Sequence, residues 1–99
     1  MSGTTASSAG LDPRRKRLLI RAWRRGMREM DILLGQFADA RAATMSDDDA
    51  AMFEKMMDEV PDRDLLAWFT GESPIEPAWD TPVWRALVAF HKHDGPVHV

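Results

Sequence analysis

The chain has 99 residues, enough for one small domain, and no cysteine, which excludes disulfides, thiolate metal sites and thiol nucleophiles. Its 13 Lys and Arg residues and 16 Asp and Glu residues give a net charge of −3. No apolar run is long enough to span a membrane, and no signal-peptide core precedes the first basic residues. We therefore expect a soluble, cytoplasmic protein with no membrane association.

Charge is divided unevenly along the chain. Residues 1–45 hold nine Lys and Arg against four Asp and Glu, whereas residues 46–99 hold four against twelve. Residues 13–28 alone contain eight basic side chains and no acid. Either the two halves neutralise each other across a folded bundle, or the basic part docks on a charged partner.

The N-terminal part predicts a tail followed by a basic helix. Residues 1–11 are rich in Ser, Thr, Gly and Ala, so we expect a disordered tail. Asp12 as N-cap and Pro13 at the first helical position begin the helix, and Gly26 stops it at the C′ position. Its short apolar face consists of Leu18, Leu19, Ala22 and Trp23.

The second helix is expected to begin near Met27–Glu29 and to end at about Ala43. Its apolar residues have the spacing of one helical face. This stripe consists of Met30, Leu33, Leu34, Phe37 and Ala38, followed by Arg41. Ile32 lies off the stripe and should pack on another neighbour.

Two shorter helices follow. Ser46 and the three acids after it mark the start of one helix, which Pro61 ends. Asp62 is expected to cap the next helix, which Gly71 ends. Their inward residues are Met52, Phe53, Met56, Met57 and Val60 in the first, and Leu65, Leu66, Trp68 and Phe69 in the second.

Residues 72–80 predict a loop that covers part of the surface with Ile75 and Trp79. Thr81 and Pro82 then begin a fifth helix, stopped by residues 94–96, and residues 96–99 should form a loose tail. Its apolar residues are Val83, Trp84, Leu87, Val88 and Phe90. No stretch alternates as a strand would, so the fold class is all-α: a compact, bundle-like single domain of five helices over residues 12–95.

Residues that could carry catalysis or bind a metal are scarce. His91, His93 and His98 lack the spacing of four that a helical metal pair needs, so we expect solvated imidazoles. The acids at 47–49 fit a helix N-terminus better than a cation site. Gly26 stands alone, so there is no glycine-rich phosphate loop. We predict a protein that is not an enzyme and binds no metal or cofactor stably.

The joint between the first two helices is the candidate binding site. Gly26 would let a partner backbone approach closely, and Arg25 offers forked donors to a carboxylate or phosphate. A purely structural alternative is a glycine cap that an Arg25–Glu29 pair closes. The partner-binding candidates are Arg24, Arg25, Gly26, Met27, Glu29, Met30 and Asp31.

A basic helix–turn–helix could instead bind nucleic acid, or act as a regulatory module. However, the helix that would enter the major groove begins with Glu29 and Asp31, which a phosphate backbone would repel. This repulsion makes nucleic acid the less favoured alternative to a protein partner.

The run from Arg24 to Leu34, with Arg17-Leu18-Leu19 before it and Phe37-Ala38 after it, closely resembles the succinate dehydrogenase assembly factor family. These small flavinylation factors carry an Arg-Gly-x-x-Glu motif, here Arg25, Gly26 and Glu29. Further similar positions are Met45 to Asp48, Phe53, Asp62, Asp64, Leu65 and Trp68. Ile20-Arg21 departs from the His-Trp of some bacterial members.

The resemblance implies a compact five-helix domain that acts as a chaperone-like factor. It would bind the flavoprotein subunit of succinate dehydrogenase, and in some bacteria that of fumarate reductase. It would promote covalent attachment of FAD to a histidine there, with Arg25, Gly26 and Glu29 at the interface. FAD would be the cofactor of this client, and we expect a monomer in the bacterial cytoplasm, or in the mitochondrial matrix of a eukaryote.

Overall fold

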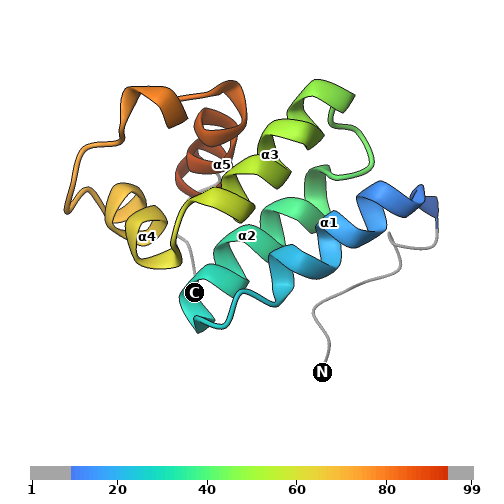
Figure 1. Cartoon of the computed structure of the whole chain (residues 1–99), viewed down its shortest axis with the longest axis horizontal. Helices are drawn as coiled ribbons and strands as arrows, with labels where there is room; N and C mark the ends of the chain where they lie inside the picture. The colour runs from blue at the N-terminus through green and yellow to red at the C-terminus, as the bar shows by residue number, and fades with distance from the viewer. Residues whose placement is uncertain (1–9, 94–99) are drawn as a thin grey trace.

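The computed structural model describes residues 10–93, and these residues form five α-helices and no strand (Figure 1). The predicted all-α class is confirmed. The expected tail at residues 96–99, the stop of the fifth helix at 94–96 and residues 1–9 of the expected N-terminal tail lie outside the described residues. The helices are α1 (Pro13–Trp23), α2 (Arg28–Arg41), α3 (Asp47–Glu59), α4 (Asp62–Thr70) and α5 (Pro82–His93), with a short 3₁₀ helix, η2 (Pro77–Trp79), before α5.

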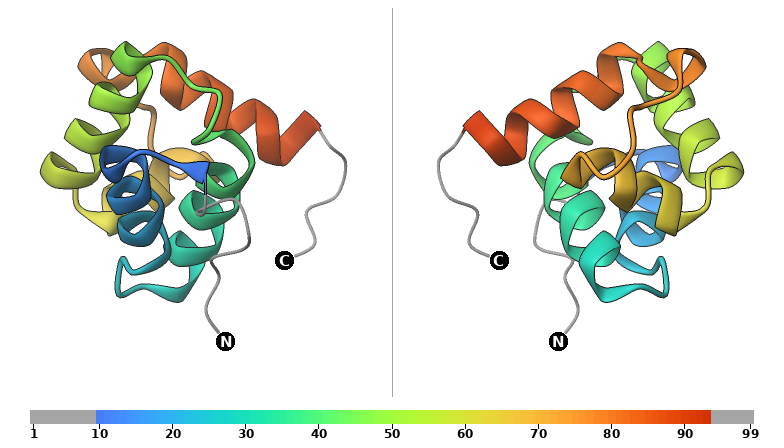
Figure 2. Two further views of the ribbon diagram at one scale, coloured as in Figure 1. Left: turned by 90° about the vertical axis from the view of Figure 1, so that its right-hand side faces the viewer. Right: turned by 90° about the vertical axis from the view of Figure 1, so that its left-hand side faces the viewer.

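Helices α1 and α2 form an antiparallel pair, with α3 alongside and α4 and α5 at the other end of the molecule (Figure 1). Figure 2 shows α5 passing across α2 and α3 and carrying its C-terminal end to the edge of the molecule. The hydrophobic core lies between these helices. Its largest fully buried side chains are Phe37, Phe53, Leu18, Leu19, Met30, Leu34, Met56, Leu65 and Leu87.

The apolar stripe predicted for α2 is confirmed, because Met30, Leu33, Leu34, Phe37 and Ala38 are all buried. Gly35 lies beside this stripe and is also buried. A Cβ atom on Gly35 would lie 2.3 Å from the Trp23 ring, so the indole of α1 packs directly on the backbone of α2. Neither the periodicity nor the motifs of the sequence predicted this contact.

Three predicted helix caps are confirmed. Asp12 accepts a hydrogen bond from the Arg15 N–H at 2.8 Å, and Ser46 accepts one from Asp49 at 3.0 Å. Thr81 accepts a hydrogen bond from the Trp84 N–H at 3.2 Å. These side chains satisfy backbone donors that have no partner within their helices.

Two predicted helix boundaries are wrong. Helix α1 ends at Trp23 with Arg24 as its C-cap, so Gly26 is not its C′ residue, although its φ of 98° is left-handed as expected. Pro61, not Asp62, is the N-cap of α4. The carboxylate of Asp62 is engaged elsewhere, because it binds Arg25.

His91 contradicts the expectation of a solvated imidazole. Its side chain is 4% exposed, and its Nε2 lies 2.7 Å from the carbonyl oxygen of Leu33. The ring also makes edge-on contacts with Phe69 and Phe90. The side chains of His93 and His98 lie outside the described part of the structure.

The basic residues of 13–28 and the acids of α3 and α4 neutralise each other in part. Four of the eight cations in residues 13–28 pair with acids of the second half of the chain. The pairs are Arg14–Glu54, Arg15–Asp47, Arg21–Asp58 and Arg25–Asp62. These four pairs support neutralisation between the two halves of the chain. The other four cations make no ion pair with the described residues, so they stay available for docking on a charged partner.

Candidate functional site

Residues 24–27 form the joint between α1 and α2, and Asp31 closes it. The carboxylate of Asp31, on the first turn of α2, accepts hydrogen bonds from the backbone N–H groups of Arg25 and Gly26. The Asp31 N–H in turn donates to the carbonyl of Met27 at 2.9 Å. Asp31 therefore fixes the turn from within, which makes it a structural residue of the joint.

Arg25 points into the molecule. Its Nε lies 2.8 Å from Asp62 Oδ1, and its Nη1 donates to the carbonyl of Met57 at 2.8 Å. The side chains of Arg25 and Asp62 are only 13% and 16% exposed. Arg25 thus ties the joint to the corner between α3 and α4, and the alternative in which it pairs with Glu29 is wrong.

The other candidate residues fall into two groups. Met30 is 1% exposed and belongs to the core, and Met27 is half-buried. Arg24, Gly26 and Glu29 are exposed. The structure brings all seven candidates to one end of the α1–α2 pair, but it offers only part of them to a partner.

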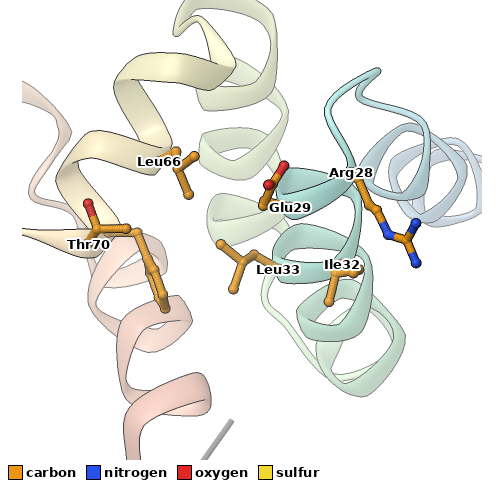
Figure 3. Close-up of a pocket in the computed structure, with 7 residues that line it drawn as sticks. Arg28, Glu29, Ile32, Leu33, Leu66 and Thr70 are labelled. Carbon is orange, nitrogen blue, oxygen red and sulfur yellow. The ribbon is translucent and has the colours of Figure 1, made fainter. Parts of the chain in front are cut away.

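An open cleft lies next to Glu29, the last residue of the Arg-Gly-x-x-Glu motif. It has a volume of about 410 Å³ and lies between α2 and α4. In Figure 3, Glu29 and Leu33 of α2 face Leu66 of α4, whereas the guanidinium of Arg28 points away from α4. The lining is mostly apolar and consists of Arg28, Glu29, Ile32, Leu33, Leu66, Phe69 and Thr70.

The cleft was not predicted from the sequence, although the sequence contained one signal for it. Ile32 lies off the core stripe of α2, and the structure shows that its side chain lines the cleft. Leu66 and Phe69, three positions apart on α4, pack against the core as expected, and their remaining surface forms the opposite wall of the cleft. A second apolar face on each of these two helices was the available sign.

Two candidate binding surfaces lie at this end of the domain, the exposed turn and the cleft. No group of three or more His, Asp or Glu side chains among residues 10–93 could hold a metal ion. No helix in the part of the chain that the structure describes is long and apolar enough to cross a membrane. The domain presents an exposed turn with a left-handed glycine next to an apolar cleft with a carboxylate at its edge. Together these features define a small all-helical binding domain.

Comparison with known proteins makes the class specific. A family model described as flavinator of succinate dehydrogenase matches residues 16–91, and the chain belongs to this family. The match covers nearly all of the described domain, including the joint and both walls of the cleft. No solved structure matches the chain.

The curated relatives include bacterial and mitochondrial proteins. The FAD assembly factor SdhE of Acetobacter pasteurianus is 37% identical over 87 residues, which cover 88% of this chain and 79% of the relative. Succinate dehydrogenase assembly factor 2 of Drosophila grimshawi, a mitochondrial protein, is 33% identical over 88% of this chain and 60% of the relative. That of Aspergillus terreus is 40% identical over 69% of this chain and 23% of the relative. None of these relatives is named for nucleic-acid binding.

Proposed function

We propose that this protein is an assembly factor that binds the flavoprotein subunit of succinate dehydrogenase and promotes covalent attachment of FAD to it. The observation that carries the proposal is the family match over residues 16–91, which spans every element of the candidate site. The names of the bacterial and mitochondrial relatives support the same process. The flavoprotein subunit of fumarate reductase is a second candidate client of the same kind.

The factor would act by binding, and the covalent chemistry would belong to the client and its flavin. By stabilising one arrangement of the client, it would bring the client histidine and the flavin ring together in a reactive geometry. The scarcity of nucleophiles supports this non-enzymatic role, since the chain has neither cysteine nor tyrosine. FAD would then be held by the client rather than stably by this chain.

The residues of the motif would have two different roles, contact with the client and support of the turn. Gly26 and Glu29 are exposed and would touch the client, together with Arg24 and Met27. Arg25 would hold the turn in place through Asp62 and Met57. Such a factor would act as a monomer in the compartment where the client acquires FAD, which is the bacterial cytoplasm or the mitochondrial matrix.

Gly26 provides the test, because a Cβ atom there would have no atom beyond its immediate chain neighbours within 4 Å, so a side chain would point into open space. Gly26→Arg should block docking, and in-gel fluorescence of covalently bound flavin in the client should fall to the level of a strain without the factor. Gly26→Ala is the matched control, because it introduces the same backbone strain at φ 98° without the bulk. Normal flavinylation with a folded Gly26→Arg variant would contradict the proposal.

A further inference from the structure

We infer that the cleft between α2 and α4 receives a large apolar side chain of the flavoprotein client, next to a client Lys or Arg that pairs with Glu29. The inference rests on the proposed function and adds α4 to the docking surface. It concerns where and by what chemistry the client is held, not whether it is held.

The floor and walls of the cleft suit an apolar group. Leu33 is buried at 7% exposure, whereas Ile32, Leu66 and Phe69 are half-buried, so these three side chains still have apolar surface to cover. A volume of about 410 Å³ lies within the range of roughly 300–1,000 Å³ found for ligand-binding pockets. A partner helix that places one or two anchor residues in such a groove is a common mode of protein recognition.

The carboxylate of Glu29 at the edge of the cleft favours a client Lys or Arg beside the apolar side chain that enters the cleft. The side chain of Glu29 is exposed and makes no ion pair or hydrogen bond with residues 10–93, and that of Arg28 points away from α4 (Figure 3). Arg25, by contrast, has a carboxylate partner inside the fold. A cation on the occupant would therefore meet an available carboxylate beside a low-dielectric groove, where such pairing discriminates strongly between partners.

Helix α5 contacts both walls of the cleft. The Nε2 of His91 lies 2.7 Å from the carbonyl of Leu33, and its ring lies 5.7 Å from that of Phe69. Lys92 donates to the carbonyl of Phe69 at 3.2 Å. Both walls are thus held in place before any partner arrives, which lowers the entropic cost of binding.

The absence of cysteine makes single-site labelling possible. Thr70→Cys places one thiol on the exposed rim of the cleft, and Thr44→Cys places one on the exposed turn after α2 as the matched control. Each variant carries an environment-sensitive fluorophore and is titrated with the purified flavoprotein subunit. Co-elution on size-exclusion chromatography reports complex formation separately. If no complex forms with the unlabelled protein, the proposed function itself fails.

We expect a blue shift at position 70 and none at position 44. A photo-cross-linker attached to the thiol of the Thr70→Cys variant should capture a client peptide that has a large apolar residue within a few positions of a Lys or Arg. A complex that co-elutes but produces neither shift nor cross-link at position 70 would overturn the inference. A shift caused by FAD alone would also overturn it, by assigning the cleft to the flavin.

Two side-chain variants test the chemistry of the occupant. Ile32→Glu should weaken client binding about tenfold or more, as loss of an interface anchor does. Ala51→Glu, which adds the same charge at an exposed position of α3, should leave binding unchanged. Glu29→Lys should weaken binding further at low salt than at high salt, because it replaces attraction of the client cation by repulsion. Equal binding by the Ile32→Glu variant and the Ala51→Glu control would contradict the inference.

Discussion

The guanidinium of Arg25 and the carboxylate of Asp62 lie 37 positions apart in sequence and 2.8 Å apart in the structure. This contact joins the turn between α1 and α2 to the first residue of α4. It sits beside the hydrogen bond from Arg25 to the carbonyl of Met57. The first residue of the Arg-Gly-x-x-Glu motif is therefore part of the internal framework of the domain.

Arg25→Ala should lower the free energy of unfolding by about 1–3 kcal/mol, because it leaves the Asp62 carboxylate and the Met57 carbonyl without their partner. Urea unfolding followed by circular dichroism measures the loss. Arg24→Ala is the control, since Arg24 is exposed and its replacement should change stability by less than about 0.5 kcal/mol. A double-mutant cycle with Asp62→Ala isolates the pair. Equal stabilities of the two arginine variants would contradict this view of Arg25.

Gly35→Ala should destabilise the domain by about 1–3 kcal/mol, because the new methyl group would overlap the Trp23 ring. The sign is diagnostic, since replacing glycine by alanine within an ordinary helix stabilises by roughly 0.5–1 kcal/mol. Thermal unfolding measures the change. Trp23→Leu in the same chain should recover part of the loss of Gly35→Ala. A stabilised Gly35→Ala variant would show that Trp23 does not pack there.

His91 should carry its proton on Nε2, because the atom 2.7 Å away is a carbonyl oxygen, which can only accept. A ¹⁵N-correlated NMR spectrum that detects ring nitrogens would show this N–H, protected from exchange with water. His91→Phe keeps ring contacts with Phe69 but removes the donor, and should cost about 1 kcal/mol of stability. An unprotonated Nε2 would contradict the hydrogen bond to Leu33.

The local features of the fold were predictable from sequence. Helix periodicity identified the core stripe of α2, and the caps at Asp12, Ser46 and Thr81 followed from side-chain chemistry alone. The family resemblance pointed to Arg25, Gly26 and Glu29 as a binding motif, and that role stays a prediction. These signals all lie within a few residues of the feature that they predict.

Features that depend on distant segments were missed. Asp62 looked like a helix cap, and only the approach of α4 to the joint reveals it as the partner of Arg25. The cleft exists because α2 and α4 leave apolar faces opposite one another, which spacing on either helix does not reveal.

The burial of His91 was predictable, however, because His91 continues the buried stripe of Trp84 and Leu87 at helical spacing.

The inward direction of Arg25 changes how genetic data on the motif should be interpreted. A substitution at this position would reduce the amount of folded protein, and cells would lose flavinylation even if the residue never touched the client. A substitution at Glu29 would leave abundance unchanged, so the same phenotype there would report on contact. Under the proposed function, missense variants of the two charged motif residues would therefore fall into different classes, one detected by steady-state protein level and the other only by association with the client.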